Sequence, residues 1–402
     1  MIYPTPNRYR DKIKANINNI NDTFLQKGEV IKGSIMNGKY PYILSGTCAA
    51  VFKIRVGTKF FALRCWTKEL LGLEKRFREI DNYLKTISLP YFVDFSFNKN
   101  GFKGDNNDFF PTLRMEWVDG CTLTDFVIKN CNNKTKIKNV AQQFLEMVQT
   151  LHANNISHGD LQGGNIMVKQ NGNICLIDYD SICTPNLQNE KNYIAGLAGF
   201  QHPLNKKSLG LEVDYFSELV IYLSLLIFSE NQNLAKNIDD KKWLFSESDL
   251  KSPTSSPIFN KLMTMSADVQ NLTKHLIDYC KTDASKLQPL ENIIDKSNNS
   301  PWEKTFSKRV ATVQTNDINE ENTTSIWNTH SKNKTTSTNK QDNTTNDWNT
   351  FSKQTNNQMS SSLNKNTSNV WGNTFSKFCN KCGKANNKPT SNFCSNCGKK
   401  RN

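Results

Sequence analysis

The sequence predicts an α+β fold with two lobes, a strand-rich lobe followed by a helical lobe. Apolar and β-branched residues dominate YILSGTCAAVFKIRVGTKFFALRCW at 42–66, which predicts three short strands. Apolar residues recur at helical spacing over 140–152 and 213–228. Between these two segments, the turn at Asn171-Gly172 joins two short apolar runs, IMV and ICLI, and predicts a hairpin. Length and element types together favour one two-lobed domain with appendages.

The remaining elements of the first lobe follow in order. Residues 69–85 have an apolar stripe typical of an amphipathic helix, formed by Leu70, Leu73, Phe77, Ile80 and Leu84. YFVDFSF at 91–97 and FFPTLRMEWVDG at 109–120 predict two more strands. Gly120 and the apolar pattern of TLTDFVIKN then begin the helical lobe.

Polar residues at the predicted hairpin have the spacing of a phosphotransferase. Phosphoryl transfer needs a carboxylate that orients the acceptor hydroxyl and oxygen ligands that hold Mg²⁺ on the nucleotide phosphates. Asp160 in HGDLQGGNIMV fits the first role. Asn165 can reach a metal from the same loop, and Asp178 can enter the site from the end of the next strand.

These motifs resemble the protein-kinase-like superfamily, more narrowly the bacterial relatives of eukaryotic-type Ser/Thr kinases. The resemblance implies a kinase-like domain at 25–295, with a small lobe at about 25–117 and a large lobe at about 118–295, and an N-terminal extension, 1–24, packed on the small lobe. It also implies ATP and Mg²⁺, or Mn²⁺, as cofactors. By matched position, the ATP-binding residues would be Gly46, Val51, Ala62, Arg64, Met115, Glu116 and Val118. His158 and Asp214 would organise the backbone of the catalytic loop.

Several residues depart from the kinase pattern. Arg64 replaces the phosphate-gripping Lys, and although it keeps the charge it is not interchangeable with Lys. Gly159 stands where regulated protein kinases carry Arg, so phosphorylation of the activation segment is not expected to regulate this chain. Tyr179-Asp180 replaces Phe-Gly and adds a carboxylate beside Asp178. Glu74 or Glu79 could pair Arg64 from the predicted helix.

The preferred function is ATP-dependent transfer of phosphate to Ser or Thr hydroxyls of proteins. Arg64, Asp180 and the poor glycine loop, which keeps only Gly46, favour the alternative of a nucleotide-binding pseudokinase scaffold. The HGD motif and Gln162 favour a small-molecule kinase of the aminoglycoside-phosphotransferase type. The tail beyond the kinase-like domain argues against this last alternative.

A second strong motif lies in residues 378–402. Two Cys-x-x-Cys-Gly knuckles are typical of a small zinc ribbon in which four thiolates bind one structural Zn²⁺: Cys379, Cys382, Cys394 and Cys397. A redox-active pair is the alternative, but no βαβ pattern supports it. So short a module has almost no core, and metal binding must stabilise its fold.

Residues 296–377 form an Asn-, Ser-, Thr- and Lys-rich linker that predicts disorder. Motifs similar to W-x-x-T-F-S-K recur in it, as WEKTFSK at Trp302, WNTHSK at Trp327, WNTFSK at Trp348 and WGNTFSK at Trp371. Together with the ribbon, the repeats are expected to recruit a protein substrate or signalling partner, or to accept phosphate. Neutral drift of a duplicated linker, with no function for the repeats, is an equal alternative. Residues 296–402 carry +10 of the total +14 charge. Nucleic-acid binding is therefore a further interpretation, but a basic tail that stays soluble is favoured.

The sequence also favours a cytoplasmic location. The N-terminus MIYPTPNRYRDKIK has no apolar signal region, and no run of eighteen apolar residues predicts a membrane span. The spacing of the seven cysteines outside the ribbon indicates no disulfide pairs, and they are interpreted as reduced thiols.

Overall fold

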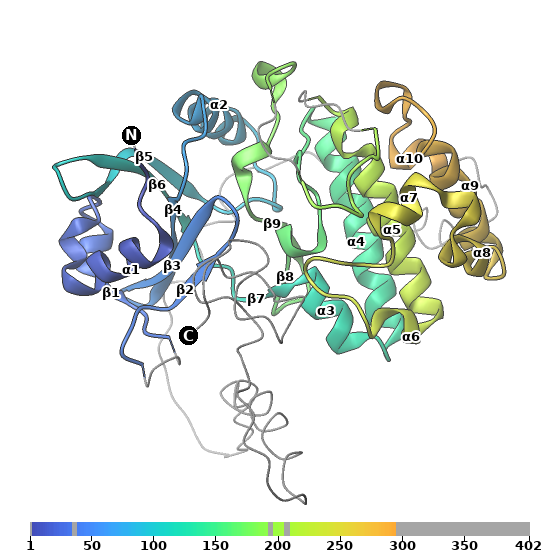
Figure 1. Cartoon of the computed structure of the whole chain (residues 1–402), viewed down its shortest axis with the longest axis horizontal. Helices are drawn as coiled ribbons and strands as arrows, with labels where there is room; N and C mark the ends of the chain where they lie inside the picture. The colour runs from blue at the N-terminus through green and yellow to red at the C-terminus, as the bar shows by residue number, and fades with distance from the viewer. Residues whose placement is uncertain (1, 34–37, 192–195, 205–209, 295–402) are drawn as a thin grey trace, which may run out of the picture. The chain divides into compact units, whose positions relative to one another are not determined.

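The structure is a computed structural model that describes residues 2–33, 38–191, 196–204 and 210–294. The chain divides into two units, Met1–Asn319 and Glu320–Asn402, and every described residue belongs to the first. The predicted linker at 296–377 and zinc ribbon at 378–402 lie outside the described residues. Figure 1 shows the strand-rich lobe on the left and the helical lobe on the right.

A six-stranded antiparallel sheet forms the small lobe. Its strands run in the order β1-β3-β4-β6-β5, with β2 paired to β3. The bounds are Glu29–Val30 (β1), Ile43–Ser45 (β2), Ala49–Val56 (β3), Lys59–Trp66 (β4), Phe95–Lys103 (β5) and Phe109–Glu116 (β6). Gly57 adopts a positive φ of 61° in the tight turn between β3 and β4. The register places Val51 beside Arg64 and Ala62 beside Met115.

The N-terminal segment packs on this sheet through α1 (Pro6–Ala15), whose first turn is capped by the side chain of Thr5. Tyr9 is fully buried and donates its hydroxyl to the carbonyl oxygen of Trp66 at 2.8 Å. Arg8 and Lys12 both bind the carboxylate of Asp105, in the connection between β5 and β6. The extension thus covers one end of the sheet with apolar contacts inside and ion pairs outside.

Helix α2 (Leu73–Thr86) begins later than the apolar stripe predicts. Gly72 precedes it with a φ of 72°, a left-handed conformation that interrupts a right-handed helix. The residues before Gly72 therefore form a loop. The buried face of the helix packs Phe77 against Trp66 and Phe97.

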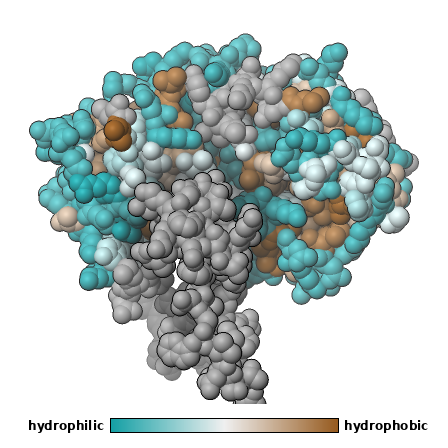
Figure 2. Space-filling model, in the orientation of Figure 1, coloured by the Kyte–Doolittle hydropathy of each residue, from teal (hydrophilic) through white to brown (hydrophobic). Residues whose placement is uncertain are grey.

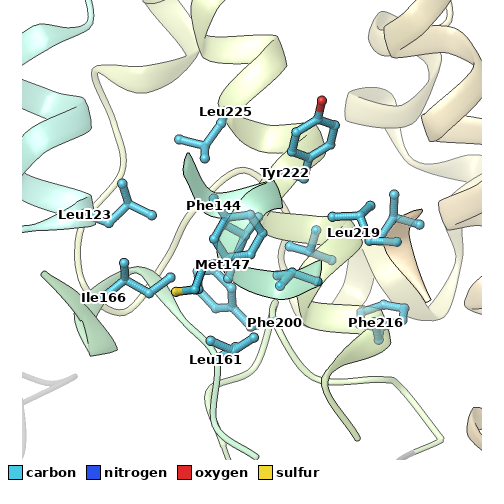
Figure 3. Packing of buried hydrophobic residues seen from close by; sticks show 14 of the residues in the cluster. Leu123, Phe144, Met147, Leu161, Ile166, Phe200, Phe216, Leu219, Tyr222 and Leu225 are labelled. Carbon is cyan, nitrogen blue, oxygen red and sulfur yellow. The ribbon is translucent and has the colours of Figure 1, made fainter. Parts of the chain in front are cut away.

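Helices α3 (Leu123–Asn130), α4 (Lys134–Ala153) and α5 (Glu212–Glu230) form the centre of the large lobe. All residues of α5 from Phe216 to Ser229 are buried, which explains why its apolar pattern is nearly continuous. Figure 3 shows side chains of α4 and α5 gathered with those of the neighbouring loop and β8, among them Phe144, Met147, Leu219, Leu225, Leu161 and Ile166. The smaller helices follow: α6 (Gln232–Ala235), α7 (Glu247–Lys251), α8 (Pro257–Leu262), α9 (Ala267–Tyr279) and α10 (Leu290–Ile294).

A second, three-stranded sheet is formed by strands that follow the small lobe in the sequence. It consists of β7 (Gly120–Thr122), β8 (Ile166–Lys169) and β9 (Ile174–Leu176), in the order β7-β8-β9. Gly172 takes a φ of 87° in the hairpin between β8 and β9, as its Asn-Gly turn requires. This hairpin places the loop 158–165 and the residues after β9 side by side, because the backbone N–H of Ile177 donates to the carbonyl oxygen of Asn165.

The surface seen in Figure 2 mixes hydrophilic residues with scattered hydrophobic ones. Across the described ranges, no helix is both long and apolar enough to cross a membrane. The seven cysteines of these ranges form no disulfide with one another.

Candidate active site

A cavity of about 730 Å³ lies between β2–β4 and the loop that follows α4. It brings together six of the residues singled out from the sequence, namely Gly46, Val51, Arg64, Asp160, Asn165 and Asp178. Gly46 lies in the turn between β2 and β3, and Val51 and Arg64 lie on β3 and β4. The last three residues lie just before β8 or just after β9. The cavity is large enough for a nucleotide-sized ligand.

Loop 158–165 is tied to the buried helix α5. The carboxylate of Asp214 accepts hydrogen bonds from the backbone N–H groups of His158 and Gly159, the second at 2.9 Å. The His158 ring contacts the carbonyl oxygen of Ile177 at 2.9 Å. Burial raises the pKa of Asp214 to about 8, although the two N–H donors act in the opposite direction. Asp214 therefore holds the loop backbone, the His158 ring contacts the segment after β9, and neither side chain lines the cavity.

Gly159 is required by geometry. Its φ is 76°, and a Cβ at this position would collide with the backbone carbonyl oxygen of Ser181. An arginine, the residue of regulated kinases, does not fit this backbone. The glycine therefore reflects close packing of the loop against the segment after β9.

Asp160 lies at the cavity with one carboxylate oxygen held and the other available. Its Oδ2 accepts from Gln162 and from Asn165, each at 3.1 Å. Its buried Oδ1 has no hydrogen-bond partner among the described residues. Burial, followed by the charge of Asp178, raises the pKa of Asp160 to about 7. A carboxylate poised near neutral pH suits a group that orients and accepts a proton.

Asn165 and Asp178 supply the donor set for a divalent cation. The Asn165 amide nitrogen donates to the backbone carbonyl of Asp160 at 2.7 Å, which leaves its side-chain oxygen as the ligand atom. Asp178 has a left-handed backbone, with a φ of 66°, and its side chain is about one-third exposed. An amide oxygen and a carboxylate fit Mg²⁺, which binds to one or two protein oxygens and to substrate phosphates.

Arg64 enters the same cavity from β4. Its guanidinium lies 3.0 Å from Asp178 Oδ1 and 2.5 Å from Asp180 Oδ2. Burial by itself would lower the pKa of Arg64, but the two carboxylates raise it above its usual range. Burial raises the pKa of Asp180 while Arg64 opposes this rise. The Arg64 guanidinium therefore contacts both carboxylates, and its positive charge offsets the repulsion between Asp178 and Asp180.

The expectation that Glu74 or Glu79 pairs Arg64 is wrong for this structure. Glu74 pairs with Lys99 at 2.9 Å. Glu79 lies 3.6 Å from Arg78 and accepts from Asn186. Both carboxylates lie on faces of α2 directed elsewhere, because the buried face of the helix is formed by Leu73, Arg76, Phe77 and Ile80.

The four remaining residues assigned to nucleotide binding do not line the large cavity. Ala62 and Met115 are paired across β4 and β6, and Val118 follows β6. Met115 and Glu116 instead line a separate cavity of about 230 Å³. The Glu116 N–H donates to the carbonyl of Asp94 at 3.1 Å, so an adenine contact from Glu116 can involve only its carbonyl oxygen.

The structure adds residues to the site that the sequence did not assign. Trp66 donates its indole N–H to Asp180 at 3.2 Å. It lies two residues after Arg64 on the same strand, so the two-residue period of a strand could have indicated that both face the same way. Asp240 and Lys241, from the turn before α7, also line the cavity, and no local pattern marks them.

The protein kinase domain family matches this chain over residues 42–291, which is more than half of its length. The chain therefore belongs to the protein kinase domain family. The loop 158–165 and most residues that line the large cavity lie within the matched range.

Named relatives are Ser/Thr kinases of eukaryotes. The serine/threonine-protein kinase MST20 of Pyricularia oryzae is 28% identical over 191 residues, covering 44% of this chain and 21% of that protein. The serine/threonine-protein kinase ste20 of Emericella nidulans is 30% identical over 115 residues, covering 28% of this chain and 14% of that protein. The probable serine/threonine-protein kinase mkcC of Dictyostelium discoideum is 31% identical over 115 residues, covering 28% of this chain and 13% of that protein.

These matches reach about a fifth of the relatives' own length or less. A solved structure, the kinase PK-1 of Cydia pomonella granulovirus, aligns at 15% identity with a TM-score of 0.43, covering 67% of this chain and 94% of that one.

Proposed function

We propose that this chain is an ATP-dependent protein kinase that transfers phosphate to Ser and Thr hydroxyls. The observation that carries the proposal is the shared cavity of Asp160, Asn165, Asp178 and Arg64, in which Asp160 keeps an unpaired carboxylate oxygen. Membership of the protein kinase domain family and relatives described as Ser/Thr kinases support the choice of acceptor.

Each residue of the cavity has a distinct part in this reaction. Asp160 orients the acceptor hydroxyl through Oδ1 and accepts its proton, while Gln162 and Asn165 hold Oδ2 in place. Asn165 and Asp178 would hold Mg²⁺, which neutralises charge on the phosphates when bound. Arg64 binds phosphate oxygens with its guanidinium. Val51, which lines the same cavity, provides apolar surface toward the base.

The ion pair of Arg64 favours a second candidate, a nucleotide-binding pseudokinase. The guanidinium that should hold phosphate and the carboxylate that should hold metal are bound to each other, with Arg64 and Asp178 3.0 Å apart. A pseudokinase would bind ATP without transferring its phosphate. Binding and transfer therefore have to be measured in the same preparation.

Incubating the purified chain with γ-labelled ATP and Mg²⁺ or Mn²⁺ tests the proposal. We expect label on phosphoserine or phosphothreonine of the chain itself, mainly within 296–377, because a tethered acceptor has an effective concentration of the order of millimolar. Phosphoamino-acid analysis and peptide mapping identify the sites. A chain that binds MgATP and transfers no phosphate to itself or to added protein would instead be a pseudokinase.

We also propose that the tail recruits a protein substrate or signalling partner. The Trp repeats and the cysteine knuckles support this because each offers an anchor for a partner, whereas a membrane or a nucleic acid is not required. The cytoplasmic location and the resemblance to bacterial kinases stay predictions from the sequence. The relatives named above come from fungi and Dictyostelium.

We further propose that Cys379, Cys382, Cys394 and Cys397 bind one structural Zn²⁺. The described ranges contain no group of three or more His, Cys, Asp or Glu side chains that could hold a metal ion, and these four cysteines lie outside those ranges. The proposal therefore rests on the two Cys-x-x-Cys-Gly knuckles alone. Four thiolates complete a tetrahedral shell, so the metal would have no open position for catalysis.

Metal analysis of the reduced full chain checks this prediction. We expect about one Zn²⁺ per chain, and we expect Cys379→Ser to release it and to make 378–402 sensitive to protease, because so small a module folds only with its metal. Cys280→Ser, a change outside the knuckles, should retain the metal. A zinc-free parent chain, or a Cys379→Ser variant that no longer binds MgATP, would contradict this modular arrangement.

A further inference from the structure

The buried carboxylate that holds Arg64 comes from the segment after β9. Asp180 Oδ2 lies 2.5 Å from the guanidinium, with side-chain exposures of 13% for Arg64 and 2% for Asp180. The same oxygen accepts the indole N–H of Trp66 at 3.2 Å. Two donors on one face of β4 therefore converge on a single carboxylate oxygen.

Helix α2 offers no carboxylate to Arg64. Its acidic residues Glu74 and Glu79 pair with Lys99 and with Arg78 and Asn186, as described above, and its third, Asp81, pairs with Lys85 at 2.6 Å. Its buried charged residue is a cation, Arg76, which contacts the carbonyl oxygens of Ile182 and Lys191. Helix α2 reaches the same segment through a second cation, because Lys75 pairs with Glu190 at 2.7 Å, and through Glu79, which accepts from Asn186. None of these contacts brings a carboxylate of α2 to Arg64.

The residues around Asp180 are held rigidly. Tyr179 is fully buried, and its hydroxyl accepts from the Val93 N–H at 2.9 Å and donates to the Leu176 carbonyl at 3.2 Å. Its ring makes edge contacts with Phe92 and Phe95. Since Tyr179 lies between Asp178 and Asp180, this packing fixes both carboxylates relative to β4.

We propose that Asp180 is a positioning residue that replaces the helix glutamate of protein kinases and holds Arg64 at the phosphate end of the cavity. The inference rests on the proposed kinase function. In protein kinases the pair between the strand cation and the helix glutamate must be in place for transfer, and movement of the helix controls it. Here the partner belongs to the segment after β9, so Arg64 is held without a carboxylate from α2.

The pairing of Arg64 with two carboxylates also affects how Asp178 can bind a metal ion. Asp178 is the proposed metal ligand, and an Arg64 held by Asp178 alone would compete with Mg²⁺ for that carboxylate. Asp180 gives Arg64 a second partner, whose side chain is only 2% exposed. Arg64 can then turn from Asp178 to the phosphates while its charge stays compensated.

Asp180→Asn tests the proposal, because it keeps the shape of the side chain and removes its charge. We expect the KM for ATP to rise and kcat to fall, each by about tenfold or more, in protein that remains folded by circular dichroism. Loss of folded protein alone would lower the rate and leave KM unchanged. Glu74→Gln and Glu79→Gln are matched controls, and both should leave KM and kcat within about twofold.

The affinity for MgATP, measured by calorimetry on the same preparations, separates this proposal from the proposed function. A parent chain that binds MgATP but transfers no phosphate contradicts the kinase activity. In that case the affinity for MgATP decides the role of Asp180, and we expect Asp180→Asn to bind MgATP about tenfold more weakly than the parent. The role proposed for Asp180 would be overturned if Asp180→Asn had the affinity and kinetics of the parent. It would also be overturned if Glu74→Gln or Glu79→Gln lost as much affinity for MgATP as Asp180→Asn.

Trp66→Phe provides the second variant if Asp180→Asn does not fold. It keeps a buried aromatic ring and removes the indole N–H that orients Asp180, together with the volume of the second ring. We expect KM for ATP to rise about threefold to tenfold. An unchanged KM in a folded Trp66→Phe variant would count against the proposal.

Discussion

Asp160→Ala should lower phosphate transfer by about 10²- to 10⁴-fold while leaving the affinity for MgATP nearly unchanged. Asp160 keeps one carboxylate oxygen without a hydrogen-bond partner among the described residues, and it lines the same cavity as Asn165 and Asp178. Removing it takes away both the orientation of the hydroxyl and the acceptor for its proton. Steady-state transfer to protein, with calorimetric binding of MgATP, measures the two effects separately.

Asp11→Ala is the matched control, because Asp11 is an exposed carboxylate of α1 that pairs with Arg10. It should transfer phosphate at the parent rate. Equal labelling by the parent and Asp160→Ala would remove Asp160 from the catalytic assignment. An Asp160→Ala variant that loses MgATP binding to the same extent as transfer would indicate a collapsed cavity.

The pH dependence of the parent provides a second test of Asp160. The carboxylate must be ionised to accept a proton, and burial raises its pKa to about 7. The value of kcat/KM should therefore fall as the pH decreases through about 7, with the proton-bound form inactive. A profile that stays flat from about pH 8 to about pH 5.5 would contradict this assignment.

His152→Ala should destabilise the domain by about 3 to 5 kcal/mol, because it leaves a buried carboxylate without its partner. His152 on α4 lies 2.9 Å from Glu218 of α5 and 2.9 Å from Glu291 of α10. The side chain of Glu218 is only 2% exposed. The imidazolium therefore joins three helices of the large lobe, and its loss exposes an uncompensated charge to a medium of low polarity.

The stability should depend on pH in a defined direction. Burial alone would lower the pKa of His152, but the two carboxylates raise it to about 10, above its ordinary value of 6.5. The stabilisation is therefore complete below about pH 6.5 and is lost as the pH rises through about 10. Burial raises the pKa of Glu218, whereas the pKa of the more exposed Glu291 is lowered. Glu218 is thus the carboxylate that depends most on His152.

Urea denaturation at neutral pH measures this effect. His275→Ala on α9 is the matched control and should change the free energy of unfolding by less than about 1 kcal/mol. The double variant His152→Ala with Glu218→Gln should lose less than the sum of the two single changes, because neither charge remains buried alone. Additive losses, or a His152→Ala variant as stable as the parent, would show that the ion pairs contribute little.

The sequence by itself determined the two-lobed α+β fold and the chemistry of the loop 158–165. Asp160 and Asn165 lie just before one hairpin and Asp178 just after it, so local strand and turn signals suffice to bring them together. Tertiary structure alone decided the partner of Arg64. Asp180 lies 116 residues away in the chain, and the choice between it, Glu74 and Glu79 depends on which face of α2 is buried. The apolar stripe predicts the helix but not its rotation against a distant strand, because that rotation is set by packing of Phe77 against Trp66 and Phe97.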